Sequence, residues 1–267
     1  MFHFSTLLAR LRGLLGVTPR SVLAATEPPP CDPLDHEHPA WTDLLRKYVE
    51  DGAVDYATMK AHGEPELATY LRSLEAVCPE DYAGFTREQR LAFWVNAYNA
   101  YTVRLILDHY PLTSIRRIGW LPLAAFRERF IPLRALGGEK KLSLGQVEHE
   151  QLRERLKDPR IHFAIVCASR SCPRLRGEAY RASEVDAQLD EAARGFIRDP
   201  LRNRVDADKG EAKVSSIFKW FRADFEREGE TLGGYLARYA EPAAAEVLRR
   251  KGRALRFLAY DWSLNGR

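Results

Sequence analysis

The sequence lacks a long hydrophobic run, since no stretch approaches the roughly 18 uninterrupted apolar residues that a membrane-spanning helix requires. It has no internal repeat, which excludes a solenoid or propeller architecture. It also lacks a strong excess of one charge, because 41 Lys and Arg residues oppose 37 Asp and Glu residues and the two signs are interspersed. Without a basic block beside stacking aromatic residues, binding to nucleic acid is not expected.

Cysteine is scarce as well, with four residues among 267. Two of them, Cys167 and Cys172, lie in one short stretch, IHFAIVCASRSCP. Cys31 and Cys78 are isolated in the sequence, and we interpret them as incidental. The chain is 45% hydrophobic and 29% charged, a composition that can bury a sizeable core, so we expect a folded protein.

Residues 1–38 differ in composition from the rest of the chain. MFHFSTLLARLRGLLGVTPRSVLAA is basic and ends in small residues like a secretory signal, but Arg10 and Arg12 interrupt its apolar stretch. As a helix it would form an amphipathic anchor that contacts a membrane surface through residues 1–15, and a frayed terminus is the alternative. The proline-rich TEPPPCDPLDHEHP then predicts an extended linker. We therefore expect a degenerate signal or anchor and a linker over residues 1–38, and one globular domain over residues 39–267.

The domain is predicted to be mainly helical. Thr86 and Gln89 form a capping box that opens a helix ending before Pro111, and this helix is apolar on nearly every side. It still carries Asn96 and Asn99, one turn apart. Burying a carboxamide costs about 1–3 kcal/mol unless it is hydrogen-bonded. The two amides therefore either tie the helix to a neighbouring loop or line a cleft.

A second capping box, Ser143 with Gln146, opens a helix that ends before Pro159. The spacing of His149, Leu152 and Leu156 predicts that His149 points inward. Further amphipathic helices are expected after Ser183 and after Ser216.

Two strands are predicted. We expect them to form part of a small central sheet that is packed by several helices. Residues 161–168 are rich in β-branched and apolar residues, as a buried strand is. In ALRFLAYDWSLN, residues 254–265, alternation puts Asp261 on the same face as Leu255 and Phe257. A buried carboxylate at a strand end requires a partner, so we expect Asp261 to be paired.

The loop after the first strand carries both thiols. Its free backbone N–H groups and Arg170 are expected to lower the pKa of Cys167, whose thiolate would be the reactive form. Three interpretations are open: a nucleophile with a histidine base and Asp261 as orienting group, a metal site with His162 or His149, or a loop disulfide. The metal interpretation lacks the second pair of ligands that structural metal sites contain.

Six blocks of the sequence resemble, in this order, the conserved blocks of the DUF547 domain family: FWVNAYNAYTVRLIL, SIRRIG, LSLGQVEHEQL, DPRIHFAIVCASRSCP, VSSIFKWFRADF and LAYDWSLN. The resemblance runs from about Trp41 to Asn265. The positions that match the family are Asn96, Asn99, Glu148, His149, His162, Cys167, Ser169, Cys172, Asp261, Trp262 and Asn265. Bacterial members often carry a signal peptide, so the resemblance favours the periplasm or cell envelope over the cytoplasm. The biochemistry of the family is unassigned, and the resemblance implies a site without a reaction.

We interpret these positions as one cleft of an α+β, predominantly helical domain that loosely resembles papain-like and transglutaminase-like thiol enzymes. Those enzymes carry the nucleophile at the start of the central helix, where this chain has asparagine. The expected function is a thiol-dependent hydrolase or acyltransferase without cofactor or metal, acting on a small molecule or a peptide. The alternative is a non-catalytic binding domain with a structural cysteine pair. The expected catalytic residues are Cys167, His149, His162 and Asp261. The expected substrate-binding residues are Asn96, Asn99, Glu148, Ser169, Arg170, Trp262 and Asn265.

Overall fold

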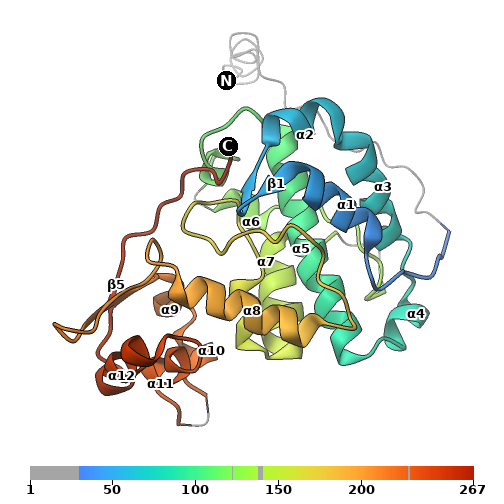
Figure 1. Ribbon diagram of the computed structural model, residues 1–267. Helices are drawn as coiled ribbons and strands as arrows, with labels where there is room; N and C mark the ends of the chain where they lie inside the picture. The colour runs from blue at the N-terminus through green and yellow to red at the C-terminus, as the bar shows by residue number, and fades with distance from the viewer. Residues whose placement is uncertain (1–29, 122, 138–140, 228) are drawn as a thin grey trace, which may run out of the picture.

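Helix α5 (Arg87–His109) runs through the middle of the molecule, and other helices surround it (Figure 1). The computed structural model describes residues 30–121, 123–137, 141–227 and 229–267. The predicted capping box is confirmed: Gln89 N donates to Thr86 Oγ1 at 3.2 Å, and Thr86 N donates to Gln89 Oε1 at 2.8 Å. Every residue from Leu91 to Val103 is buried. A helix enclosed on all sides depends on tertiary packing for its stability, so α5 is the core of the fold.

The N-terminal half adds short helices and one hairpin to the surface of α5. Their bounds are α1 (Pro39–Tyr48), β1 (Val49–Glu50), β2 (Ala53–Val54), α2 (Tyr56–His62), α3 (Glu64–Glu75) and α4 (Pro79–Ala83). Helices α2 and α3 contact α5, and α1 packs against α3, where Trp41 stacks on Tyr70 with ring centroids 5.4 Å apart. Large buried aromatic side chains of this kind contribute much of the apolar area in a core.

Cys31 and Cys78 form a disulfide that joins the chain before α1 to the start of α4, with Cα atoms 5.5 Å apart. The interpretation of these cysteines as incidental was wrong, because their proximity arises from packing and not from sequence spacing. Asp32 N donates to Ala76 O at 3.2 Å in the same region. His38 is only 2% exposed and hydrogen-bonds the Tyr70 hydroxyl through Nδ1 at 3.0 Å. Residues 31–38 therefore contact the domain, although the sequence indicated a linker.

These contacts bear on the expectation that the globular domain begins at residue 39. A chain that starts at residue 30 keeps the Cys31–Cys78 disulfide, and a chain that starts at Pro39 loses it. Closing a loop between cysteines 47 residues apart contributes about 4 kcal/mol in the chain-entropy account. We expect both chains to unfold cooperatively in urea, the Pro39 chain at a clearly lower midpoint. Equal midpoints would show that residues 31–38 add no stability.

The C-terminal part has a smaller core of its own and contains the three-stranded sheet. Its elements are α8 (Val185–Arg198), β3 (Arg204–Asp206), β4 (Glu211–Val214), α9 (Ile217–Trp220), α10 (Arg222–Phe225), α11 (Leu232–Ala237), α12 (Pro242–Lys251) and β5 (Arg256–Phe257). Strand β4 pairs antiparallel with β3 and parallel with β5. In Figure 1 this sheet lies at the edge of the molecule, away from α5. The mainly helical α+β class is confirmed, but the sheet is not central, because α5 occupies the centre.

Five short elements connect these two parts: η2 (Ile115–Arg117), α6 (Ala124–Arg127), α7 (Leu144–Gln146), η3 (Val147–Leu156) and η4 (Pro159–Phe163). The predicted box of Ser143 and Gln146 caps α7, with Gln146 N donating to Ser143 Oγ at 3.1 Å. The helix then continues as a π-helix, η3. Its i→i+5 hydrogen bonds change which side chains share a face. His149 is consequently exposed and not directed inward as predicted.

Neither predicted strand forms as expected. Asp158 and Pro159 start a 3-10 helix instead, because the Asp158 side chain accepts from Arg160 N at 3.0 Å and proline suits the first helical position. The chain turns at Ala164, and Ile165, Val166 and Cys167 belong to no strand. Of residues 254–265, only Arg256 and Phe257 are in a named strand. The rest crosses the molecule as an extended segment, with an isolated bridge between Ser169 and Leu264.

No helix in the described part of the chain has both the length and the apolar character needed to cross a bilayer. The expected signal or anchor, with its membrane contact through residues 1–15, lies outside the described residues.

Candidate functional site

A cavity of about 180 Å³ opens where α5, η3, η4, α9 and the segment after β5 meet. Much of its wall is aromatic, formed by Tyr98, Phe126, Trp220, Phe221, Tyr260 and Trp262. Its polar lining consists of Glu148, His149, His162, Cys167 and Cys172. The structure thus brings together most of the predicted reactive side chains, from segments far apart in the sequence.

The two thiols form a close pair at this cavity. Both cysteines are free, Cys167 is partly exposed, and Cys172 is 2% exposed. Their Sγ atoms lie 2.7 Å apart. Because one thiol hydrogen-bonds the other sulfur, the pair is stabilised when it holds a single proton.

Cys172 is the better stabilised thiolate of the pair. Cys167 N donates to Cys172 Sγ at 3.1 Å. The Ser169 hydroxyl lies 3.3 Å from Cys172 Sγ, and the Tyr260 hydroxyl lies 3.1 Å from it. Burial opposes the thiolate, but the hydrogen bonds from Cys167, Ser169 and Tyr260 outweigh it and lower the pKa of Cys172 to about 6. The hydrogen bond to Cys172 and burial raise the pKa of Cys167. The predicted lowering of the Cys167 pKa was therefore wrong, because its closest charged neighbour is an anion.

The loop that carries the thiols is fixed by the segment after β5. Arg170 N donates to Ser263 O at 2.8 Å, and Ser171 N donates to Asp261 O at 3.2 Å, so these N–H groups are not free as the sequence suggested. Ala168 has a φ of 56°, a left-handed conformation that is costly for a residue with a Cβ. The Arg170 side chain is exposed and is not part of the cavity lining. Such a tightly held, strained loop is typical of a functional site.

Asp261 is exposed, which contradicts its predicted inward orientation and its role as an orienting carboxylate. Its side chain accepts from Ser263 N at 2.9 Å in a local turn. The error arose because this segment is not a regular strand, so alternation does not set the direction of its side chains. Asp261 contributes to the site through its backbone, because its N–H donates to Ser171 Oγ in the thiol loop at 2.8 Å.

Glu148 extends from η3 into the cavity. Burial raises its pKa to about 7, and the negative groups Cys172 and Asp224 act in the same direction, whereas Arg153 opposes them. The Glu148 carboxyl is therefore partly protonated near neutral pH and is able to donate a proton.

Asp224, on α10, organises the two histidines of the cavity. It hydrogen-bonds His162 Nε2 at 2.8 Å and accepts from Arg153 Nε at 2.6 Å. Burial lowers the pKa of His162, so its ring is neutral, and it stacks on Phe221 with ring centroids 4.2 Å apart. Arg153 Nη1 also lies 2.6 Å from His149 Nδ1, and burial together with Arg153 lowers the pKa of His149.

Among the described residues, neither histidine hydrogen-bonds a sulfur. The hydrogen bonds of the two thiols go to each other, to Ser169, to Tyr260 and to the backbone of Cys167. His162 is committed to Asp224, and neutral His149 lies at the exposed side of the cavity. The arrangement therefore suits His149 for contact with a substrate better than for removal of a thiol proton.

Asn96 and Asn99 are buried and hydrogen-bonded, as predicted, but they do not line the cavity. Asn99 Nδ2 donates to Ala164 O at 2.9 Å, and Asn99 Oδ1 accepts from Val166 N at 2.9 Å. Asn96 bonds both backbone groups of Tyr180 in the same way. Asn99 thus supplies the backbone partners that a sheet would have given residues 164–166.

Three other predicted positions have roles in holding the site together. Asn265 is 9% exposed and accepts from the Tyr56 hydroxyl at 2.8 Å. The Ser169 and Tyr260 hydroxyls lie 2.9 Å apart, beside the thiols. Trp262 stacks on Trp220 with ring centroids 5.8 Å apart and forms part of the aromatic wall. Among the described residues, no three His, Cys, Asp or Glu side chains are grouped to hold one metal ion.

The sequence reasoning missed Asp224, Arg153 and Tyr260. Arg153 lies one helical turn after His149, a spacing that could have indicated their contact. Asp224 lies within the VSSIFKWFRADF block, but nothing local predicts that it meets a histidine 62 residues away. Alternation along a strand would put Tyr260 on the face opposite Asp261, yet the Tyr260 hydroxyl is the group that reaches the thiols.

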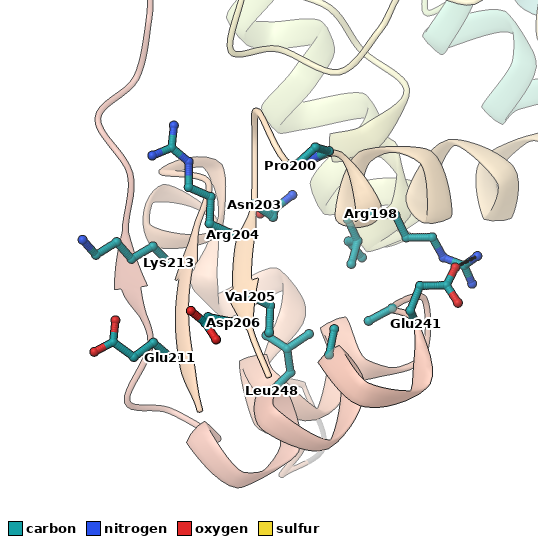
Figure 2. Close-up of a pocket in the computed structure, with 13 residues that line it drawn as sticks. Arg198, Pro200, Asn203, Arg204, Val205, Asp206, Glu211, Lys213, Glu241 and Leu248 are labelled. Carbon is teal, nitrogen blue, oxygen red and sulfur yellow. Dashed lines mark ion pairs between the residues drawn. The ribbon is translucent and has the colours of Figure 1, made fainter. Parts of the chain in front are cut away.

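A larger cavity, of about 480 Å³, lies between the β3–β4 hairpin and the helices α8 and α12 (Figure 2). Arg198 and Glu241 form an ion pair on its helical side. Asn203 is engaged by the backbone, donating to Phe196 O at 2.7 Å and accepting from Ser215 N at 3.0 Å. The residues that line this cavity include no thiol and no histidine. The smaller cavity is therefore the candidate site.

Comparison with known proteins gives a family but no activity. No match was found among curated proteins or among solved structures. The model of the family described as "Protein of unknown function, DUF547" matches residues 82–197, which include α5, η3, η4 and both thiols. Two blocks of the resemblance, around Asp224 and Tyr260, lie beyond the match. Over residues 82–197 this chain therefore matches the DUF547 family, as the sequence blocks in that range indicated.

Proposed function

We propose that this protein is a thiol-dependent hydrolase or acyltransferase in which Cys167 is the nucleophile. One observation carries the proposal: one aromatic cavity is lined by a thiol pair and by a carboxyl group. The pKa of one thiol is lowered, and the pKa of the carboxyl group is raised. The pKa of Cys172 is lowered to about 6, and the pKa of Glu148 is raised to about 7. Groups whose environments shift their pKa values in this way divide the roles of base and acid between them.

Cys172 is the base of the proposed mechanism. Its thiolate lies 2.7 Å from Cys167 Sγ, within the range for a nucleophile and its base. The Cys167 proton moves to Cys172, and the Cys167 sulfur attacks the carbonyl carbon of an ester, thioester or amide. Cys167 takes this role because it is the more exposed of the two sulfurs.

Glu148 is the acid of the proposed mechanism. It donates its proton to the leaving group as the tetrahedral intermediate collapses to a thioester on Cys167. Water or another acceptor then attacks the thioester and gives a proton to Glu148, and the departing Cys167 sulfur regains its proton from Cys172. Each residue thereby returns to its starting protonation state.

The lining of the cavity indicates the substrate class. Aromatic walls favour an apolar or aromatic acyl group, and the volume of about 180 Å³ favours a small one. We propose that this protein resembles papain-like and transglutaminase-like enzymes in its thiol chemistry only, because its thiols lie on a loop and no histidine of the described residues hydrogen-bonds them. The competing interpretation is a domain that only binds a ligand, and it predicts that no substrate is turned over.

The test is a pH profile of kcat/KM with small aromatic esters and thioesters. The Cys172 thiolate increases as the pH rises through about 6, and protonated Glu148 decreases as the pH rises through about 7. We therefore expect a bell with its maximum between these values. Cys167→Ser should abolish turnover and the acyl-enzyme seen by intact mass spectrometry. Glu148→Gln should lower kcat/KM by about 10²–10⁴ and remove the falling limb.

Asp261→Ala serves as the matched control, because this carboxylate is exposed and outside the cavity lining. It should leave the profile unchanged. Turnover that survives Cys167→Ser would overturn the proposal. Tight binding of an ester without any acyl-enzyme would favour the binding domain.

A further inference from the structure

We infer that Cys167 and Cys172 also act as a redox pair, which forms an intramolecular disulfide by exchange with a small-molecule or peptide disulfide. This activity is distinct from acyl transfer and does not depend on it. The two Sγ atoms are 2.7 Å apart, and both residues line the cavity. A disulfide bond is about 2.05 Å long, so the sulfurs need to approach by less than about 1 Å.

Backbone hydrogen bonds of the loop hold the thiols in this position. Cys172 N donates to Ser169 O at 3.0 Å, which closes a tight turn, and the left-handed Ala168 turns the chain between Cys167 and Ser169. Arg202 Nε donates to Cys172 O at 2.6 Å from outside the loop. The backbone on both sides of Cys172 is therefore held by hydrogen bonds while the two sulfurs lie next to each other.

The difference in exposure assigns the order of events. Cys167, the more exposed sulfur, passes its proton to the Cys172 thiolate and attacks one sulfur of the incoming disulfide, which releases the first thiolate. That thiolate takes the proton from Cys172. The Cys172 thiolate then attacks the Cys167 sulfur of the mixed disulfide and releases the second thiolate. The pair loses two electrons, and the incoming disulfide gains them.

The remaining cysteines support this chemistry. Cys31 and Cys78 are already joined, and disulfides persist in oxidising environments. In such an environment the closely spaced Cys167 and Cys172 would meet external disulfides continually. If the proposed acyl transfer is also correct, oxidation of the pair would remove its nucleophile.

The experiment incubates the full chain with defined ratios of reduced and oxidised glutathione, followed by alkylation with iodoacetamide. Trypsin cleaves after Arg170, between the two cysteines, so the disulfide joins peptides 161–170 and 171–174. We expect these linked peptides to increase with oxidised glutathione and to separate on reduction. Cys31 and Cys78 should remain joined over the range in which the pair responds.

Cys172→Ser is expected to stop the exchange at a mixed disulfide, with one glutathione on Cys167. Cys167→Ser should abolish the linked peptides and greatly slow glutathione addition to the buried Cys172. Equal alkylation of both thiols at every ratio would overturn the inference, and so would independent glutathione addition at both. Disulfide exchange is measured from peptide masses, and acyl transfer is measured from turnover. Failure of one proposal can therefore be distinguished from failure of the other.

Discussion

Asp224→Ala is expected to destabilise the fold by roughly 3–5 kcal/mol, because it leaves buried cationic and polar groups without their partner. Asp224 is 8% exposed and accepts from Arg153 Nε at 2.6 Å and Arg153 Nη2 at 3.2 Å. It also hydrogen-bonds His162 and accepts from Arg227 Nη2 at 3.3 Å. These bonds connect α10 to η3 and η4, so their loss separates two walls of the cavity. Urea denaturation measures the change.

Asp261→Ala is the matched control for that experiment. Asp261 is exposed and bonded within a local turn, so its loss should change stability by less than about 0.5 kcal/mol. The hydrogen bonds from His162 and Arg153 outweigh burial and lower the pKa of Asp224. Its stabilising contribution is therefore present at neutral pH and is lost as the pH falls below the usual range of an aspartate. Equal effects of the two substitutions would contradict the assigned role of Asp224.

Asn99→Leu is expected to reduce both stability and the reactivity of the thiols. The substitution leaves Ala164 C=O and Val166 N–H buried without a partner, and each such loss costs about 1–3 kcal/mol. Val166 directly precedes Cys167, so its displacement should widen the distance between the two sulfurs. Denaturation measures the stability, and the rate of iodoacetamide labelling at Cys167 measures the reactivity.

Asn96→Leu separates these two effects. Asn96 lies on the same helix, is equally buried, and also bonds two backbone groups, those of Tyr180. It should lose a similar amount of stability while labelling of Cys167 in the folded protein stays unchanged. If both variants altered labelling equally, Asn99 would have no specific role at the thiol loop.

Features that depend on local chemistry were predictable from the sequence. The capping boxes at Thr86 and Ser143 involve residues three apart, and both form as predicted. The burial of Asn96 and Asn99 followed from the apolar surroundings of their helix. The mainly helical class and the grouping of Glu148, His149, His162 and Cys167 at one cavity also agree with the sequence.

Features that depend on distant partners were not predictable. Residues 161–168 have the composition of a strand, but Asn99, 65 residues before Ala164, bonds Ala164 O and Val166 N, two groups that a sheet would otherwise pair. The π-helical spacing of η3 has no signature in the apolar pattern, so the direction of His149 was wrong. The Cys31–Cys78 pairing and the contact of His162 with Asp224 likewise arise only when the chain has folded.

The attachment of the thiol loop to residues 260–265 has a consequence for the newly made chain. Tyr260 reaches Ser169 across 91 residues of sequence, and Asn265 N donates to Ala168 O. At a translation rate of about 5–20 residues per second, the loop is synthesised roughly 5–18 s before the residues that fix it. During that interval Cys167 and Cys172 are unprotected and compete with Cys31 for Cys78. Pairing of Cys31 with Cys78 before residue 167 is synthesised would keep the loop thiols out of this competition.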